Sequence, residues 1–252
     1  LILHQVERAR EDLGKVRGIA SGHVAVGLPT GLSRLMAVPL ISEVRKHLPD
    51  ATLSISDGLS VSMQEALLSG RLDMALLYKP QPSSDLDTIP VMSEELFLVS
   101  GPSCRTEEVP VTLKQVASLP LIIPRRPHEI RLLVEAKMAE IGCKPQIFLE
   151  VDGVPAILDV LADGPGYAIL PLYAVAIYSK SDTYLFRRIV EPSLGSMLSL
   201  ATSSKRPVTE TQEAVLKLVL EICRTVLSPA IQREVELLLS QQGSSRETQS
   251  QH

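Results

Sequence analysis

The chain of 252 residues is poor in the residues on which several classes of binding protein depend. It contains no tryptophan, and aromatic residues make up only 3% of it. Sites that bind sugars or single-stranded nucleic acid rely on aromatic faces for stacking, so both kinds of site are disfavoured. The net charge is −4, so the chain as a whole offers no basic field for DNA.

Cysteine, metal-binding motifs and long apolar runs are scarce as well. The three cysteines are Cys104, Cys143 and Cys223, and an odd number argues against a disulfide scaffold. We expect isolated reduced thiols, with a redox pair between Cys104 and Cys143 as the alternative. The five histidines lack the spacing of metal ligands, and no run is long enough to cross a bilayer. No nucleophile elbow, phosphate-binding glycine loop, HExxH or CxxC pattern occurs, so we expect no catalysis, no cofactor and no metal.

Residues 1–20 are predicted to be the end of a linker or dimerisation helix. Apolar residues recur there at spacings of four and three, as in a coiled coil, at Ile2, Val6, Ala9, Leu13 and Val16. The alternative is an ordinary amphipathic helix that lies on its own domain. The segment is charged throughout and has no continuous apolar stretch of a signal peptide, so we expect a cytoplasmic protein. The missing initial Met indicates that an N-terminal part has been removed.

Residues 22–50 are predicted to form a strand, a tight turn and a helix, the first half of a βαβ unit. Hydrophobic residues make up 45% of the chain, enough for a sizeable core. The turn holds Pro29, Thr30 and Gly31, and Thr30 stands where a helix N-cap belongs. Such a turn can present free backbone N–H groups and the positive end of a helix dipole. Pro39 interrupts the helical period, so we expect a kink or a restart there.

The rest of the chain repeats this alternation of strands and helices. A strand at 51–56, a helix over 61–68 capped by Ser60, and an apolar strand at 72–77 predict a doubly wound parallel sheet. The order of elements over 100–195 predicts a second α/β lobe. The further elements expected are strands at 88–92, 95–100, 121–123, 146–151, 167–170 and 197–202, and helices at 130–141, 154–162, 209–227 and 231–239.

Seven short motifs follow one another in a specific order. They are GHVAVG at 22–27, Pro29-Thr30, Leu48-Pro49-Asp50, DGLS at 57–60, SGRLDMA at 69–75, EELFLV at 94–99 and DGPGYAILP at 163–171. Each is weak alone, but together they resemble the regulatory, effector-binding part of a LysR-type transcriptional regulator, over residues 1–230. The chain is most similar to nitrogen-assimilation-control regulators, in which a loop like Arg126-Pro127-His128 recurs.

This resemblance implies an α/β fold like that of type 2 periplasmic binding proteins. Two doubly wound subdomains would be joined by two crossing strands and preceded by a linker helix. Subdomain I would comprise residues 21–95 and 200–230, subdomain II residues 96–199, and residues 231–252 a terminal helix and disordered tail. A small-molecule effector would bind in the cleft between the lobes, and the chain would form a dimer or tetramer. It would reach DNA only through a winged helix-turn-helix domain absent from this chain, and it would bind no membrane.

The candidate effector-binding residues stand where predicted strands end and helices begin. In the first lobe, hydroxyl and N–H groups at such turns can receive an anion, at Thr30, Gly31, Leu32, Ser60 and Val61. In the second lobe we favour Arg126 and His128 from a cluster that includes Arg125 and Arg131, because a guanidinium can pair with a carboxylate. Beyond Asp152, which can also repel an anion, we favour backbone contacts at Gly153 and Val154. Plain helix caps and a solvated charged face are the alternatives.

These residues predict a sensor of a small anionic metabolite. Two other functions stay open at this point. A solute-binding protein of a transport system would need an export signal and no dimer helix, and an enzyme on the same scaffold would show turnover. The sequence does not identify the effector, the target genes or the direction of regulation.

Overall fold

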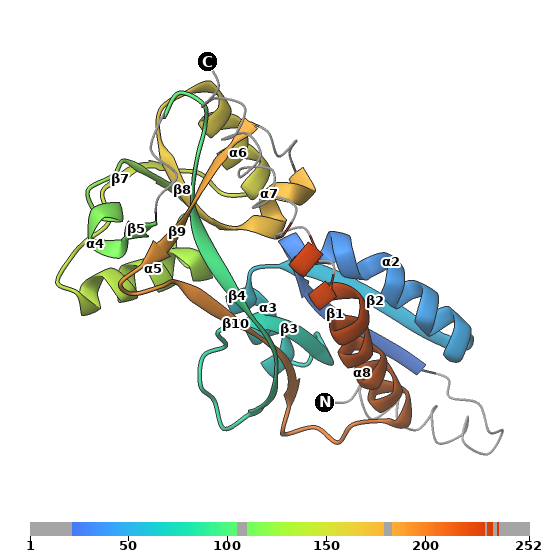
Figure 1. The fold of residues 1–252 in the computed structure, drawn as a ribbon. Helices are drawn as coiled ribbons and strands as arrows, with labels where there is room; N and C mark the ends of the chain where they lie inside the picture. Colours follow the sequence, from blue (N-terminus) through green and yellow to red (C-terminus); the bar gives the residue numbers. More distant parts are fainter. Residues whose placement is uncertain (1–21, 105–109, 179–182, 230, 234–235, 237–252) are drawn as a thin grey trace. The chain divides into compact units, whose positions relative to one another are not determined.

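A computed structural model describes residues 22–104, 110–178, 183–229, 231–233 and 236 (Figure 1). The predicted helix of residues 1–20 and the tail after residue 236 lie outside the described part. The described residues divide into two compact units, unit 1 with residues 22–92 and 197–229, and unit 2 with residues 93–196 and the few described after 229. The chain passes between the units inside two strands, β4 (Leu86–Ser100) and β10 (Gly195–Ser203).

The sheet of unit 1 is built around β1 (Gly22–Pro29). This strand pairs in parallel with both β2 (Ala51–Gly58) and β3 (Met74–Tyr78), while β10 pairs antiparallel with β3. The helices α2 (Thr30–His47) and α3 (Ser60–Leu68) connect the parallel strands in the predicted βαβ order. Every residue of β3 and the last six residues of β1 are buried, as expected for strands covered on both faces.

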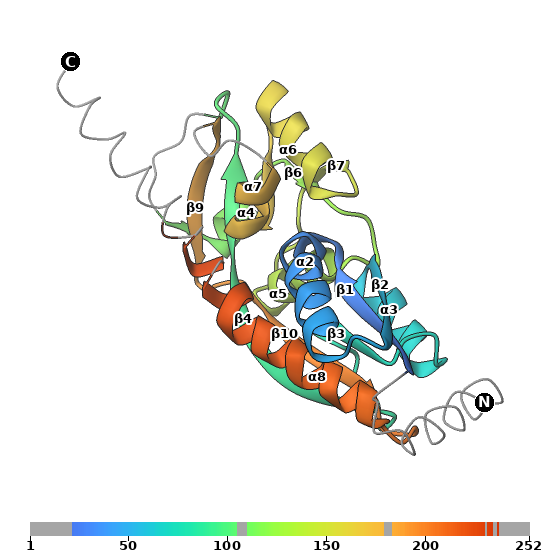
Figure 2. The ribbon, with the colours of Figure 1, turned by 90° about the vertical axis from the view of Figure 1, so that its right-hand side faces the viewer.

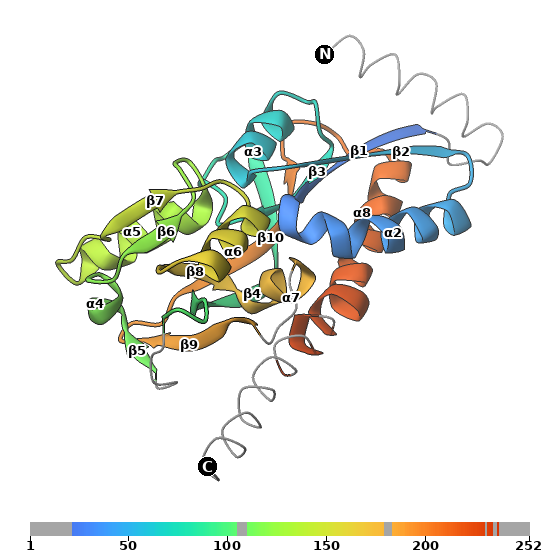
Figure 3. The ribbon, with the colours of Figure 1, turned by 90° about the horizontal axis from the view of Figure 1, so that it is seen from above.

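Helices cover both faces of this sheet. α2 and α8 (Glu210–Ile222) contact each other on one face, whereas α3 lies on the opposite face (Figures 2 and 3). α3 packs Met63 and Leu67 into a core of small and aliphatic side chains. Gly27 allows this close approach, because a Cβ there would lie 2.7 Å from Cδ1 of Leu72.

Unit 2 contains a second set of parallel strands. β6 (Leu121–Ile123) pairs in parallel with β7 (Ile147–Glu150) and β8 (Tyr167–Pro171). β4 pairs antiparallel with β8 and with β9 (Leu185–Val190), which in turn pairs with β5 (Val111–Thr112). The apolar faces of four helices complete one core with these strands: α4 (Leu113–Val116), α5 (Glu129–Glu140), α6 (Val154–Asp163) and α7 (Leu172–Tyr178). None of the helices in the described part of the chain is both long and apolar enough to span a membrane.

Two predicted interruptions are absent. α2 runs unbroken through Pro39, because Leu32, Met36, Leu40 and Val44 bury one continuous face that outweighs the hydrogen bond lost at proline. The strands predicted at 88–92 and 95–100 are one strand, β4. Its first half is largely exposed and its second half buried, because the strand leaves one unit and enters the other. That change of pattern resembles a turn in the sequence.

Several elements of unit 2, α7 and β9 among them, are missing from the sequence prediction, and one helix of unit 1 ends early. α7 has the sequence LYAVAIY and is apolar on all sides, so it gives no amphipathic period. β9 is short and carries two arginines in its middle. α8 begins with the capping box of Thr209 and Gln212, as its predicted start requires, but the α-helix ends at Ile222 and a π-helical turn follows over Cys223–Leu227.

Gly101, directly after β4, lies against the backbone of α6. A Cβ at this position would overlap the carbonyl oxygen of Leu161 in α6. We therefore expect Gly101→Ala to lower the free energy of unfolding by about 3 kcal/mol, measured by urea denaturation. Gly58→Ala is the control, because nothing lies within 4 Å of its added Cβ, and it should change stability by less than about 0.5 kcal/mol. Equal stabilities of the two variants would contradict this packing.

Candidate functional site

Two helices of unit 1 begin at the same edge of its sheet. β1 and β2 are parallel neighbours, and Pro29 lies opposite Gly58, so the strands end level with each other. α2 then begins at Thr30 and α3 at Ser60. Such an edge, at the carboxyl ends of parallel strands, is where open α/β sheets hold ligands.

The prediction that Thr30 and Ser60 cap these helices is wrong. The N-cap positions belong to Pro29, with φ −57° and ψ 139°, and to Leu59, with φ −72° and ψ 142°. Thr30 and Ser60 are already the first helical residues, because the preceding residue supplies the extended conformation that a cap requires. Neither helix has a capping hydrogen bond from a side chain, so N–H groups of its first turn stay available.

The predicted residues of unit 1 differ in how they can contact a ligand. Thr30 is exposed, whereas Leu32 is fully buried in the core and brings only its backbone to the turn. Ser60 is also buried, and its Oγ accepts a hydrogen bond from the N–H of Tyr78 at 3.0 Å. That bond ties the start of α3 to the end of β3. Gly31 and Val61 are half-buried beside Thr30 and Ser60.

Unit 2 repeats this arrangement at the ends of β6 and β7. These strands are parallel neighbours, and Ile123 lies opposite Glu150. His128 caps α5, its Nδ1 accepting a hydrogen bond from the N–H of Ile130 at 3.2 Å. Gly153 is the N-cap of α6, with φ +92° and no side-chain cap, and Val154 is the first residue of that helix. His128, Gly153 and Val154 therefore all belong to helix starts at one sheet edge.

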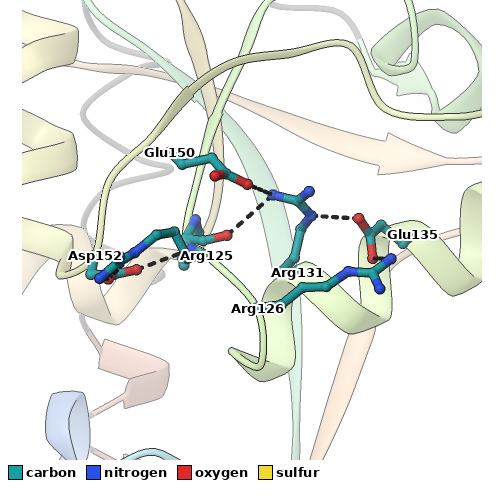
Figure 4. A network of polar contacts seen from close by, with 7 residues as sticks. Arg125, Arg126, Arg131, Glu135, Glu150 and Asp152 are labelled. Atoms are coloured by element: carbon teal, nitrogen blue, oxygen red, sulfur yellow. Dashed lines mark hydrogen bonds and ion pairs between the residues drawn. The ribbon is translucent and has the colours of Figure 1, made fainter.

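A network of four charged side chains fixes the loop between β6 and α5 (Figure 4). Arg131 is 8% exposed and donates from Nε to Glu135 at 2.6 Å and from Nη1 to Glu150 at 2.9 Å. Arg126 reaches Glu135 as well, with 2.7 Å between Nη2 and Oε2. Burial raises the pKa of Glu135, but the hydrogen bonds from Arg131 and Arg126 outweigh burial and hold that pKa below its usual range. Glu135 is thus ionised at neutral pH and holds both guanidinium groups.

A separate ion pair joins Arg125 to Asp152. Nε and Nη2 of Arg125 donate to Oδ2 of Asp152 at 2.7 and 2.5 Å, and the backbone N–H of Arg125 donates to Oδ1 at 3.0 Å (Figure 4). Hydrogen bonds from the side chain and the backbone of Arg125 lower the pKa of Asp152. Both residues are visible in the sequence as charged groups, but their pairing is not. Each residue follows one of two neighbouring parallel strands, and only the pairing of these strands brings the two residues together.

A small hollow lies elsewhere in unit 1, near the start of β3. Its polar side chains bond to one another and to the backbone: Gln212 Nε2 donates to Asp73 at 2.7 Å, and Arg206 Nη2 donates to the carbonyl oxygen of Leu72 at 3.1 Å. These bonds join α8 and the chain before it to β3, so we assign this hollow a structural role. Over the described ranges, no three His, Cys, Asp or Glu side chains are grouped so that they could hold a metal ion.

The sequence matches the family described as the LysR substrate binding domain over residues 17–224. The chain belongs to this family. It is similar to the nitrogen assimilation regulatory protein nac of Klebsiella aerogenes, with 28% identity over 239 residues, 94% of this chain and 77% of that protein. It is also similar to the regulator BbuR of Bordetella bronchiseptica, with 27% identity over 216 residues, 85% of this chain and 66% of that protein.

Solved structures show the same fold. OxyR of Corynebacterium glutamicum has a TM-score of 0.73 at 16% identity, covering 95% of this chain and 73% of that one. The effector-binding domain of QuiR has a TM-score of 0.69 at 20% identity, covering 81% of this chain and 98% of that one. The predicted family and the α/β fold of the type 2 periplasmic-binding-protein kind are confirmed. The chain is the effector-binding domain of a LysR-type transcriptional regulator, which belongs to a family of regulators rather than enzymes.

The two kinds of arginine contact differ in their value for stability. Arg131→Met removes a buried partner from Glu135 and Glu150 and should lower the free energy of unfolding by about 2 kcal/mol. Arg125→Met removes an exposed pair, with the Arg125 side chain 68% exposed, and should cost less than about 1 kcal/mol. Urea denaturation of both variants measures the difference. Equal losses would contradict the assignment of Arg131 as the structural arginine.

Proposed function

We propose that this domain senses a small anionic metabolite at the carboxyl ends of its parallel strands. The most direct support is that α2, α3 and α6 begin without a side-chain cap. Arginine side chains before α5 add positive charge (Figure 4). The proposed effector-binding residues are those expected from the sequence: Thr30, Gly31, Leu32, Ser60, Val61, Arg126, His128, Gly153 and Val154.

The chemistry of these helix starts favours an anion. Backbone N–H groups without a cap point out of the first turn, and the helix dipole adds partial positive charge there. A carboxylate or inorganic oxyanion satisfies several such donors at once. The solved QuiR domain was obtained in complex with shikimate, an organic anion, which supports this ligand class.

The signal would be passed on through changes in self-association. A ligand can shift a conformational equilibrium only by its difference in affinity for the two states, so the effector must favour one arrangement of the regulator. We propose that this arrangement sets how subunits, as a dimer or tetramer, assemble on DNA through a winged helix-turn-helix domain.

An exposed apolar sheet edge supports self-association. β7 pairs with β6 on one side, and its side chains at Ile147, Phe148 and Leu149 are 38%, 57% and 38% exposed. An edge strand with exposed apolar side chains can add another strand or pack against another surface. A second copy of the chain is the partner we propose for this edge.

Calorimetry with organic acids, nucleobases and inorganic oxyanions tests the ligand class. We expect at least one anion to bind with a Kd between about 1 μM and 1 mM. Thr30→Val removes an exposed hydroxyl at nearly constant volume and should weaken this binding roughly two- to tenfold. Thr52→Val makes the same change in an exposed residue near the opposite end of β2 and should leave the Kd unchanged. Binding of only cationic or neutral apolar compounds would end the proposal.

Sedimentation velocity over a range of concentrations tests the self-association. The wild-type chain should show a concentration-dependent dimer or larger species, and Phe148→Asp should shift it towards monomer, because a charge replaces an apolar contact at the β7 edge. Val208→Asp is the matched control, since Val208 is 52% exposed but lies in the loop before α8. A wild-type chain that stays monomeric at every concentration would contradict the proposal.

A further inference from the structure

We propose that Asp152 is a built-in competitor that an anionic effector must displace from Arg125. This inference rests on the proposed function and deepens it, because it adds Arg125 to the proposed effector-binding residues and names the group that sets the affinity of Arg125 for the anion. The proposed exchange is a competition between two anions for one guanidinium group, and no covalent bond changes.

Arg125 holds both oxygens of the Asp152 carboxylate, Oδ2 with its guanidinium group and Oδ1 with its backbone N–H. Two side-chain donors of Arg125 and its backbone N–H all point at the carboxylate of Asp152, at 2.7, 2.5 and 3.0 Å. Asp152 stands between the end of β7 and the N-cap of α6. It therefore occupies, at the carboxyl edge of the sheet, the position in which this fold would hold an external anion.

Among Arg125, Arg126 and Arg131, Arg125 is the one suited to exchange partners. Arg131 is buried between two glutamates, and Arg126 extends along α5 to Glu135 (Figure 4). The Arg126 side chain is also exposed, at 67%, but its partner Glu135 is only 19% exposed. The partner of Arg125 is more accessible: the side chain of Asp152 is 49% exposed and that of Arg125 68%. Because exposed ion pairs contribute little net free energy, a dissolved anion can compete with one at ordinary concentrations.

The space next to the pair is open. Gly153 follows Asp152 directly, and a Cβ added to this glycine would meet nothing within 4 Å. At neutral pH Asp152 is ionised, since the hydrogen bonds from Arg125 lower its pKa. It therefore competes with an external anion for Arg125 as a charged carboxylate. The ligand must offer what Asp152 offers, at least two oxygen acceptors that share a negative charge. A carboxylate, sulfate or phosphate group meets this requirement.

Asp152→Asn removes the charge and keeps the size and one oxygen acceptor for the backbone N–H of Arg125. We expect it to tighten the binding of anions roughly two- to fivefold, the range set by the strength of an exposed ion pair. Asp159→Asn is the matched control, because Asp159 is an exposed carboxylate on α6 and its replacement changes the net charge equally. The control should change the Kd by less than about 1.5-fold.

The experiment is calorimetric titration of the wild type, D152N, D159N, R125M and the double variant R125M/D152N. The probes are inorganic sulfate, succinate and the tightest-binding acid of the panel, with neutral succinamide for comparison. D152N should bind the anions more tightly and leave the affinity for succinamide unchanged. The gain should vanish when Arg125 is absent, because the two residues act on one interaction. Thermal melts of all variants confirm that each is folded.

The outcomes separate this inference from the proposed function. If the wild type binds anions but D152N gains no more than D159N, or gains as much without Arg125, the competitor role of Asp152 is overturned and the anion sensor stands. If no anion binds to the wild type or to D152N, both proposals are overturned. A gain for succinamide equal to that for succinate would show a change of shape rather than of charge, and would also overturn the inference.

Discussion

Parallel pairing of neighbouring strands brings the starts of the helices to one edge of each sheet, where we propose that a ligand binds. In unit 1 the register places Pro29 opposite Gly58, and in unit 2 it places Ile123 opposite Glu150. Each pair of strands therefore ends level, and each strand leads into a helix that starts at that edge. Antiparallel neighbours would send consecutive turns to opposite edges. Within each unit, this register places the helix starts at one edge of the sheet. In unit 2 it places the arginines there as well.

The same constraint explains how much of the fold the sequence could predict. Strands covered on both faces must be apolar, so β1 and β3 are visible as apolar runs between helical periods. Prediction failed where burial did not follow the type of element. β4 changes from exposed to buried along its length, and α7 is apolar all round. The helix starts were misplaced by one residue, because Pro29 and Leu59 take the capping conformation without a capping side chain.

The charged groups at the candidate site were visible in the sequence, but their partners were not. Arg125 and Asp152 are 27 residues apart, and Arg131 and Glu150 are 19 apart. No motif links residues at such separations. Only the pairing of β6 with β7 brings them together. A cluster of arginines in a sequence therefore does not say which of them is free to bind a ligand, because that depends on the carboxylates that the fold supplies.

The different roles that we assign to Arg131 and Arg125 follow from the solvent exposure of each ion pair. A buried guanidinium must keep its carboxylates, since the loss of one partner leaves an uncompensated charge in a poorly solvated place. Arg131 therefore suits a fixed role, and its bonds to Glu150 and to the carbonyl oxygen of Pro124 hold α5 to β7 and to the loop after β6. A sensor also needs a charge whose partner can be exchanged at a free-energy cost that a dilute metabolite can supply. In our proposal Arg125 meets that need, because water solvates its exposed guanidinium group and the released carboxylate when the ion pair opens.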